Sequence, residues 1–405
     1  MPDGKRPVLV TFKRKNHRQD STTDKCDIVR SSIQSDVHFF TADDFSRGNV
    51  VPSGMPEDRI GYDVNRYDAP IVMARLTDEE VQRLQTDPNV ETVEDDQPAW
   101  ALEAVQPGAL LIEDQPTPQS ETVPSGVSQV KAPSGWPASQ GLAVKVGILD
   151  TGIQGNHPDL QPNFRFGQSF VPDESSTDDF NGHGTHVAGT VAAAINGQGV
   201  VGVAPAAYLY AVKVLNRHGS GQYSWIIAGI DWCVNKKRMH IINMSLGGSS
   251  SSNALKSMCD SAYNEGVLLV AAAGNSGPPS GGGGSSVGFP AAYESVIAVS
   301  AIGSDNVIAG FSSRGPEVEL CAPGVQVLST YPGNGYRRLN GTSMACPHVA
   351  GAAAMAWGSH RYQVNKTIRK LLQTTADDLG NPGRNSLYGF GRVDAWESSV
   401  SFNAP

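Results

Sequence analysis

One stretch decides the fold of this chain: Val144-Lys145-Val146-Gly147-Ile148-Leu149-Asp150. Its aliphatic and β-branched residues predict a buried strand that carries the Asp150 carboxylate at its carboxyl end. Further apolar runs, such as 267–273, alternate with helical segments that we expect at 187–196, 224–235 and 253–265. This alternation predicts an α/β fold in which helices cover both faces of a parallel sheet. Active residues in such a fold belong at the carboxyl ends of strands.

Two further motifs each combine a reactive side chain with the small residues of a tightly packed helix start. His183 opens His183-Gly184-Thr185-His186, and Ser343 lies in Gly341-Thr342-Ser343-Met344. A serine hydroxyl becomes a good nucleophile only when a neighbouring base takes its proton, and an acid must hold that base in the right tautomer. Asp150, His183 and Ser343 are therefore candidate catalytic residues.

The order Asp, His, Ser along the chain is that of subtilisin, and other serine hydrolase folds use other orders. From about residue 122 to about residue 393 the chain closely resembles the subtilisin family of serine proteases, peptidase S8, above all at 126–133, 212–225 and 243–248. The resemblance implies a seven-stranded-type parallel sheet and a serine endopeptidase that works through an acyl-enzyme.

The same resemblance implies how substrate is held. Asn275, which follows a buried strand, matches the family's oxyanion donor, and the backbone N–H of Ser343 would be the second donor. Two segments match those that clamp an extended peptide, and small residues leave an uncharged first pocket suited to Leu, Phe, Tyr or Met. The implied substrate-binding residues are Gly219, Ser220, Gly221, Tyr223, Ser245, Leu246, Gly247, Ala272, Gly274 and Gly288. We therefore expect protein and peptide substrates and broad specificity.

The chain also resembles the family at its high-affinity calcium site. The implied ligands are all oxygens, as Ca²⁺ prefers, and come from Glu121, Asp159, Ala194, Asn196, Gln198 and Val200. A plain loop without metal is the alternative. We expect no catalytic metal, because the HExxH signature is absent, and we interpret His186 and His348 as structural residues.

The first hundred residues follow another pattern. Strands are expected at 7–12 and 71–76, Thr77 is expected to cap a helix that begins with acidic residues, and 90–96 alternates like an exposed strand. This pattern predicts a small α+β, ferredoxin-like sandwich, and its acidic end resembles the tail of inhibitor I9-type subtilisin propeptides. The expected organisation is a propeptide at 1–102, a linker or extension at 103–119 and a catalytic domain at 120–405. An unrelated N-terminal domain is the alternative.

The resemblance implies a zymogen whose own propeptide inhibits it in cis and aids its folding. Such enzymes are cut shortly after the propeptide's acidic strand. Here Leu102 would fill an uncharged first pocket, with Ala101 and Ala99 at the second and fourth positions, so the cut is expected between Leu102 and Glu103. A later cut near residue 119 or 120 would remove the extension.

Composition narrows the remaining possibilities. The net charge of −9 argues against nucleic acid as a partner, and no apolar run is long enough to span a membrane. We expect a monomer that is secreted, with a cytoplasmic protein as the alternative because no secretory signal is recognisable.

Cys233 and Cys259 fall on consecutive helices and could pair, although small buried hydrophobic residues are the favoured interpretation. An inactive binding scaffold and a serine esterase are the alternative functions.

Overall fold

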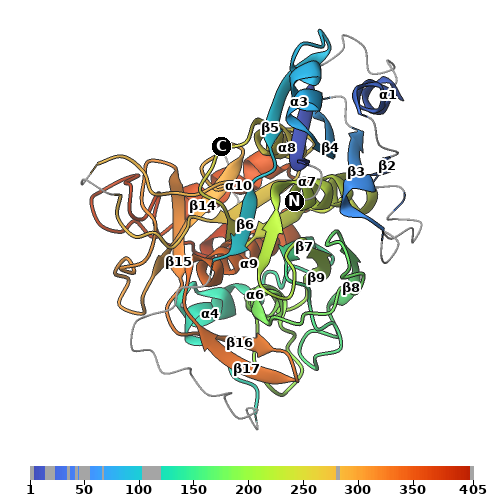
Figure 1. Ribbon diagram of the computed structural model, residues 1–405. Helices are drawn as coiled ribbons and strands as arrows, with labels where there is room; N and C mark the ends of the chain where they lie inside the picture. The colour runs from blue at the N-terminus through green and yellow to red at the C-terminus, as the bar shows by residue number, and fades with distance from the viewer. Residues whose placement is uncertain are drawn as a thin grey trace.

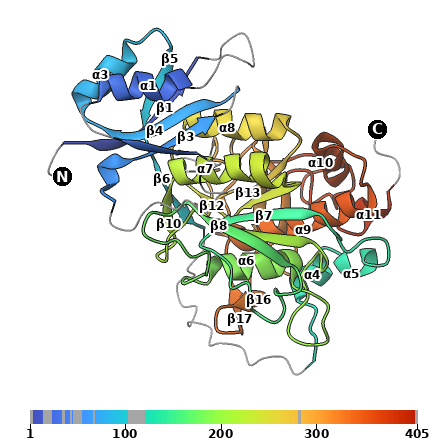
Figure 2. The ribbon, with the colours of Figure 1, turned by 90° about the vertical axis from the view of Figure 1, so that its right-hand side faces the viewer.

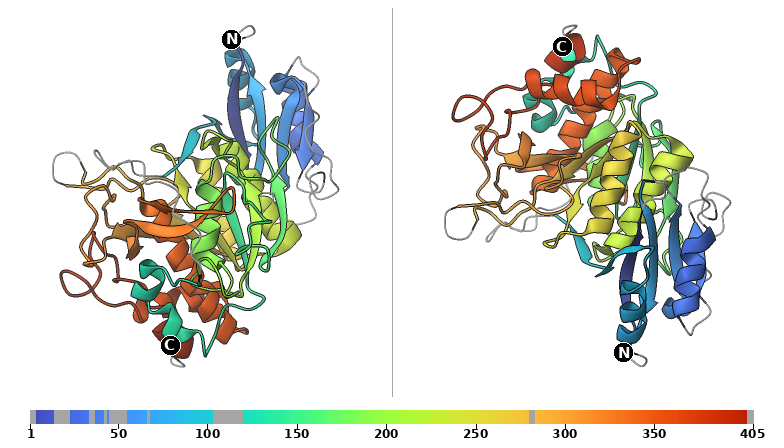
Figure 3. Two further views of the ribbon diagram at one scale, coloured as in Figure 1. Left: turned by 90° about the horizontal axis from the view of Figure 1, so that it is seen from below. Right: turned by 90° about the horizontal axis from the view of Figure 1, so that it is seen from above.

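The computed structural model describes residues 4–13, 23–33, 37–41, 44, 55–65, 68–102, 120–279 and 283–401. These residues form an N-terminal unit, the described residues between 4 and 96, and a main unit, residues 120–401 without 280–282. The two units are joined through β6 (Pro98–Ala101), which runs into the main unit (Figure 1). The N-terminal unit and the last helices of the chain lie at opposite ends of the molecule (Figure 3).

The main unit is built on a seven-stranded parallel sheet in the order β15-β14-β13-β11-β7-β9-β8. The central strands are buried, because helices cover both faces and leave no solvent-facing side that would select polar residues. The strands are β7 (Lys145–Asp150), β8 (Phe164–Ser169), β9 (Tyr208–Lys213), β11 (Ile241–Met244), β13 (Leu268–Ala272), β14 (Val296–Ile302) and β15 (Val318–Pro323). The predicted parallel α/β architecture is confirmed.

Each face of the sheet has its own hydrophobic cluster. Ile148 of β7 packs with α6 (His183–Ala192), α9 (Thr342–Ser359) and α10 (Asn365–Thr374), whereas the next residue, Leu149, packs with α7 (Tyr223–Trp232) and α8 (Asn253–Asn264) on the opposite face (Figure 2). This alternation follows from the period of two in a strand. The remaining elements of the main unit are α4 (Ser125–Gln129), α5 (Ala132–Gly135), β10 (Ser220–Gln222), η2 (Cys233–Lys237), β12 (Leu246–Gly247), β16 (Val327–Tyr331), β17 (Gly335–Leu339) and α11 (Glu397–Val400).

The N-terminal unit is a five-stranded sheet in the order β2-β3-β4-β1-β5 with two helices on one face. Four of its strands have the antiparallel order of a ferredoxin-like fold, and β2 adds a parallel edge strand, so the expected α+β sandwich is present. The expected cap at Thr77 is confirmed, and it is reciprocal, because the Thr77 hydroxyl oxygen accepts from the Glu80 amide while the Glu80 carboxylate accepts from the Thr77 amide. The elements are β1 (Arg6–Phe12), α1 (Thr23–Ser32), β2 (His38–Thr41), η1 (Glu57–Arg59), β3 (Ile60–Asn65), β4 (Pro70–Leu76), α3 (Asp78–Gln85) and β5 (Val90–Asp95).

The open face of this small sheet packs against the main unit. Val8 and Val10 of β1 join the cluster beneath α1 and α3, whereas Leu9 between them joins the cluster that contains Ile226 of α7 and Met258 of α8. Figure 2 shows α7 and α8 lying between the N-terminal sheet and the central sheet. The two helices therefore have sheets on both sides, which buries apolar surface that would otherwise face water.

One predicted helix is displaced. The helical segment was expected at 187–196, but α6 begins at His183, where a helix start was also expected, and ends at Ala192. It begins early because the Asp179 carboxylate accepts hydrogen bonds from the amides of Gly182 and Thr185. It ends early because the backbone turns at Ala193, after which the Ala194 N–H donates to the Asp159 carbonyl. Of the other two helices, 253–265 agrees with α8 within one residue, and α7 continues beyond Trp232 as the π-helical turn η2.

Candidate active site

Two of the three candidate catalytic side chains are in direct contact. Asp150 is the last residue of β7 and His183 the first residue of α6, and both are buried. The distance between His183 Nδ1 and Asp150 Oδ1 is 2.7 Å. A carboxylate at this distance holds the imidazole in the tautomer that carries its proton on Nδ1, which leaves Nε2 as the basic nitrogen.

Ser343 lies in the first turn of α9, which packs against α6. Its hydroxyl donates to the Ser245 carbonyl at 2.9 Å, and the Ser245 hydroxyl donates back to the Ser343 carbonyl at 2.9 Å. This reciprocal pair ties the start of α9 to the segment after β11. The amides in the first turn of a helix have no partner within the helix, so the Ser343 N–H is suited to donate outwards.

Asn275, which follows β13, contacts the chain segment that enters from the N-terminal unit. Its side-chain nitrogen donates to the Leu102 carbonyl oxygen at 2.7 Å. The amide has this orientation because its oxygen accepts from the backbone N–H of Thr342 at 3.0 Å and from the Thr342 hydroxyl at 2.9 Å. The amide nitrogen is therefore turned towards the carbonyl that enters the site.

The segment that ends at Leu102 is held as a strand between the two predicted clamping segments. β6 pairs antiparallel with β10 on one side, where Trp100 lies opposite Ser220, and with β12 on the other, where Trp100 lies opposite Gly247. The Ala101 N–H donates to the Gly219 carbonyl at 2.9 Å, and the Leu102 N–H donates to the Ser245 carbonyl at 3.4 Å. The strand thus bonds along both of its edges, which is recognition through the main chain.

The side chains of this strand alternate between solvent and pockets. Trp100 is 47% exposed, whereas Ala99 is fully buried in the same cluster as Tyr223, whose amide donates to the Gln97 carbonyl. Leu102 packs against the cluster that contains Ala272, and a Cβ at Gly247 would lie 3.2 Å from its Cδ1. A side chain at position 247 would therefore narrow the space around Leu102.

Two glycines that the resemblance implies for the first pocket, Gly274 and Gly288, lie close together. Gly274 has a φ of +115°, a conformation that favours glycine, and the Gly288 N–H donates to the Ala273 carbonyl at 2.9 Å. The segment 272–274 is thereby joined to Gly288, another residue that the resemblance implies for the first pocket. Glu103, expected on the other side of the cut bond, lies outside the described residues.

Two acidic residues that the sequence analysis did not single out join the N-terminal unit to the main unit. Glu94 accepts from the Ser252 hydroxyl at 2.7 Å and from the amides of Asn253 and Ala254 at the start of α8. Asp96 accepts from the Ser224 amide at the start of α7 at 3.0 Å. Both carboxylates satisfy otherwise unpaired helix amides and lie at the positive ends of the helix dipoles. In the sequence, the acidic end of the segment 90–96 and the spacing of two between these residues pointed to them, but neither feature identified their partners.

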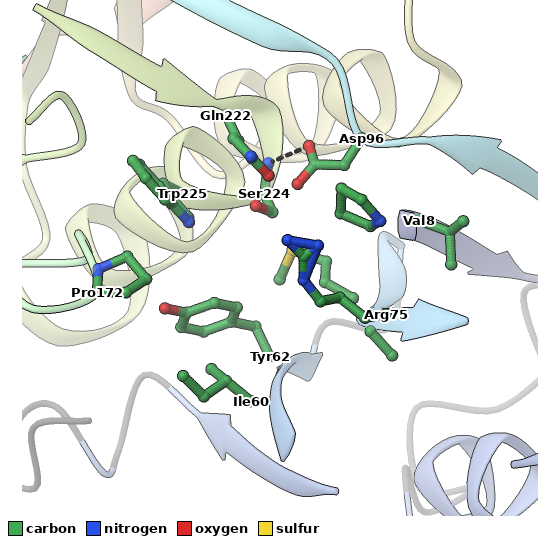
Figure 4. Close-up of a pocket in the computed structure, with 12 residues that line it drawn as sticks. Val8, Ile60, Tyr62, Arg75, Asp96, Pro172, Gln222, Ser224 and Trp225 are labelled. Carbon is green, nitrogen blue, oxygen red and sulfur yellow. Dashed lines mark hydrogen bonds between the residues drawn. The ribbon is translucent and has the colours of Figure 1, made fainter. Parts of the chain in front are cut away.

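A cavity of about 240 Å³ lies at this junction, and Asp96 lines it together with Tyr62, Arg75 and Trp225 (Figure 4). Burial raises the pKa of Asp96 to about 6, although its hydrogen bonds with Ser224 and the charge of Arg75 oppose the rise. The junction between the two units therefore contains a carboxyl group that titrates in the mildly acidic range.

The implied calcium ligands gather around one loop. The Glu121 carboxylate accepts from the amides of Asn196 and Gly197, and the buried Asp159 carboxylate accepts from the Val200 amide at 2.8 Å and from the Asn196 side-chain nitrogen at 3.0 Å. Ala194 and Gln198 belong to the same loop, where the Ala194 N–H donates to the Asp159 carbonyl and the Gln198 N–H to the Asn196 side-chain oxygen.

Two carboxylates and the side-chain amide of Asn196 meet at this loop, and oxygens of these kinds are the ligands that Ca²⁺ prefers. For Asn196 to be a ligand, its amide would have to turn its oxygen towards Asp159. The segment that carries Glu121 is anchored on the same loop, since the Thr122 N–H donates to the Gly199 carbonyl at 2.8 Å and the Val201 N–H to the Thr122 carbonyl at 3.1 Å.

The two additional histidines and the cysteines lie in the interior. His186 Nε2 lies 2.9 Å from the Val327 carbonyl oxygen, and burial lowers its pKa to about 3. His348 Nδ1 lies 2.8 Å from the Met344 carbonyl oxygen, and burial lowers its pKa to about 4. Cys233 and Cys259 are buried free thiols, so the possible disulfide does not form; the other three cysteines, Cys26, Cys321 and Cys346, are also buried and free.

Among the residues that the structure describes, no helix has both the length and the apolar character needed to cross a membrane.

Residues 141–391 match the model of the subtilase family of peptidases. The chain is 47% identical over 326 residues to subtilisin amylosacchariticus of Bacillus subtilis subsp. amylosacchariticus, which covers 79% of this chain and 78% of that protein.

Two other relatives show similar agreement. A subtilisin of Bacillus pumilus is 50% identical over 280 residues, 68% of this chain and 98% of that protein. A thermostable alkaline protease of Halalkalibacterium halodurans is 44% identical over 327 residues, 80% of this chain and 82% of that protein. With this agreement and the parallel sheet described above, the chain is a subtilisin-like serine endopeptidase and belongs to the subtilase family.

Proposed function

We propose that Ser343, His183 and Asp150 are the catalytic triad of this endopeptidase. In this mechanism the Ser343 hydroxyl hydrogen turns from the Ser245 carbonyl towards His183, which takes the proton as Ser343 Oγ attacks the carbonyl carbon of the residue before the cut bond. His183 then gives the proton to the leaving amine. Water next attacks the acyl-enzyme with His183 again acting as the base. The 2.7 Å contact between His183 Nδ1 and Asp150 Oδ1 supports the assignment of base and acid.

Asn275 and the Ser343 N–H would stabilise the oxyanion. The observation that carries this proposal most directly is the 2.7 Å hydrogen bond from Asn275 Nδ2 to the Leu102 carbonyl oxygen. That carbonyl belongs to a strand clamped on both edges, as a substrate strand would be. A donor already aimed at this oxygen can follow it as it gains negative charge, without the reorganisation that water would need.

The same contacts support a preference for large apolar side chains before the cut bond. Leu102 is partly buried against an apolar cluster and lies beside Gly247, where no side chain narrows the space. Only main-chain atoms hold the rest of the strand along its edges, so we infer broad specificity for protein substrates.

We also infer that residues 1–102 are an inhibitory propeptide, with the catalytic domain at 120–405 and an extension at 103–119. The open face of the N-terminal sheet covers α7 and α8, and β6, which follows this sheet along the chain, lies between the two clamping segments. A segment in this position blocks substrate in cis, and it remains a bound product after cleavage between Leu102 and Glu103. Such latency would protect the producing cell from proteolysis. We therefore propose that the mature enzyme is secreted. Recovery of the processed chain only from the cell interior would refute this proposal.

The decisive experiment compares wild-type protein with Ser343→Ala. Wild-type protein should hydrolyse a peptide p-nitroanilide with Leu or Phe at the reacting position and should show a new N-terminus at Glu103. Ser343→Ala should remain as the uncut chain, with turnover lower by about 10⁶-fold, the size of the corresponding loss in subtilisin. The variant should keep the circular dichroism spectrum of the folded chain. Near-normal hydrolysis by Ser343→Ala would rule out the proposed nucleophile.

A further inference from the structure

The Asp179 carboxylate, which the catalytic mechanism does not use, accepts five hydrogen bonds in the interior of the protein. One oxygen accepts from the Thr151 hydroxyl at 2.8 Å and from the amides of Asn181 at 3.0 Å and Gly182 at 2.8 Å. The other accepts from the Thr185 amide at 2.8 Å and hydroxyl at 2.7 Å. Asp179 itself is 5% exposed. A buried carboxylate with this many donors is held in one position.

These donors come from the two segments that carry Asp150 and His183. Thr151 directly follows Asp150, and its own N–H donates to Asp150 Oδ1 at 2.8 Å. Gly182 directly precedes His183 and gives α6 no side-chain cap, so the Asp179 carboxylate fills that role from outside the helix. The Thr151 hydroxyl also accepts from the Gly184 amide at 3.0 Å, which closes the network on the other side of His183.

We propose that Asp179 is a positioning residue that sets the contact between Asp150 and His183 by clamping the end of β7 to the start of α6. This inference rests on the proposed function, because it assigns a support to the proposed triad. Asp150 and His183 lie on different elements, so their 2.7 Å contact depends on how those two elements are held together. A displacement of about 1 Å at a reacting group can lower turnover by about 100-fold.

The link through Thr151 can be broken separately from the cap of α6. Thr151→Val keeps the shape of the side chain and removes the hydroxyl that joins Asp179 to β7, while the amides of Gly182 and Thr185 still donate to Asp179. The matched control is Thr330→Val, which also removes a buried threonine hydroxyl that holds α6. The Thr330 hydroxyl donates to the Thr185 carbonyl at 2.8 Å and has no hydrogen bond with Asp179. Each variant loses one buried hydrogen bond to α6, from the Gly184 amide in Thr151→Val and to the Thr185 carbonyl in Thr330→Val, and only Thr151→Val also loses the bond to Asp179.

Turnover of a peptide p-nitroanilide by the processed enzyme is the first measurement. We expect Thr151→Val to lower kcat by about 10- to 100-fold with KM within about twofold of wild type. Thr330→Val should keep kcat within about twofold, even if its thermal midpoint falls. A kcat for Thr151→Val as close to wild type as that of the control would overturn the proposal, as would equal losses of kcat in both variants.

The second measurement does not need activity or processing. In the uncut Ser343→Ala chain, the proton on His183 Nδ1 should give a low-field proton resonance because it is shared with Asp150. Adding Thr151→Val should shift or broaden this resonance, and adding Thr330→Val should leave it unchanged. An unchanged resonance with Thr151→Val would refute the positioning role even if Ser343 proves to be the nucleophile. An active Ser343→Ala protein would instead refute the proposed function.

Discussion

Thr342 holds the oxygen of the Asn275 side-chain amide with both its backbone N–H, at 3.0 Å, and its hydroxyl, at 2.9 Å. The residue before the proposed nucleophile thereby orients the proposed oxyanion donor. Because the hydroxyl also accepts from the Gly274 amide at 3.1 Å, it holds the backbone of the residue before Asn275 as well as the Asn275 side chain.

Removing the Asn275 amide should therefore lower kcat more than removing the Thr342 hydroxyl that orients it. Asn275→Leu should lower kcat by about 10²–10³-fold, the loss found for this donor in subtilisin, with little change in KM. Thr342→Val keeps the backbone N–H that bonds Asn275 and should lower kcat by about tenfold at most. Steady-state kinetics on one p-nitroanilide substrate measure both effects, and equal losses in the two variants would show that Thr342 does more than orient Asn275.

The first cut should depend on the side chain at position 102. Leu102→Phe should be processed at a rate similar to wild type, because the pocket takes a large apolar group. Leu102→Asp would bring a charge into an apolar pocket without a partner and should slow cleavage after residue 102 by at least about 100-fold. Intact mass and N-terminal sequencing over time provide the measurement. Unchanged cleavage at Glu103 in Leu102→Asp would place Leu102 outside the first pocket.

Asp96 predicts how the latent chain responds to pH. Its pKa is raised from an ordinary value of 3.8 to about 6 in the folded chain. The folded chain therefore favours the protonated carboxyl. The stabilisation that this gives is fully present below about pH 4 and is lost as the pH rises through about 6. In uncut Ser343→Ala protein, the free energy of unfolding of the N-terminal unit should fall over this range, and Asp96→Asn should make the fall shallower.

Asparagine keeps an acceptor for the Ser224 amide and removes the titrating group. Denaturant unfolding at pH 4.5, 6.0 and 7.5, compared between the two chains, checks this prediction. The Asp96 assignment fails if both chains show the same pH dependence.

Calcium should stabilise the folded chain through the loop that contains Asn196. An ion bound only to the folded state at 100 times its dissociation constant adds about 2.7 kcal/mol. A chelator should then lower the thermal midpoint by about 5–10 °C for a domain of this size. Asp159→Asn should abolish this sensitivity, and Asp305→Asn, at an exposed position in another loop, should retain it. If the chelator does not change the thermal midpoint of the wild-type protein, the proposed calcium site is wrong.

The sequence was informative wherever a local pattern decides the structure. Asp150 could be placed at a strand end because the six residues before it are mostly aliphatic, and the cap at Thr77 could be predicted because a run of acidic residues follows it. The start of α6 at His183 was expected from its small residues, but its capping group could not be predicted, because Asp179 lies four residues earlier in a segment without helical periodicity.

The caps formed by Glu94 and Asp96 could not be found in this way. Their partners are at Ser252 and Ser224, far along the chain, and the pairing exists only after the N-terminal sheet docks on α7 and α8. An acidic run at the end of a strand has the same sequence pattern whether it faces water or the start of a helix. The order Asp, His, Ser was informative for another reason, since the resemblance to a family supplied the long-range contacts that local patterns lack.

The anchoring of Thr122 on the loop at 199–201 has a consequence for how long latency lasts. Leu102 is seated at Asn275 while Thr122 is bonded to Gly199 and Val201, so both ends of the intervening segment are fixed at once in the uncut chain. In the proposed zymogen, the N-terminal unit would meet the substrate channel at an effective concentration that dilution cannot change until the bond after Leu102 is cut. After that cut it would become a separate molecule, and its occupancy of the channel would depend on the amount of protein present. Dilution alone then distinguishes the latent chain from a cut but still inhibited enzyme.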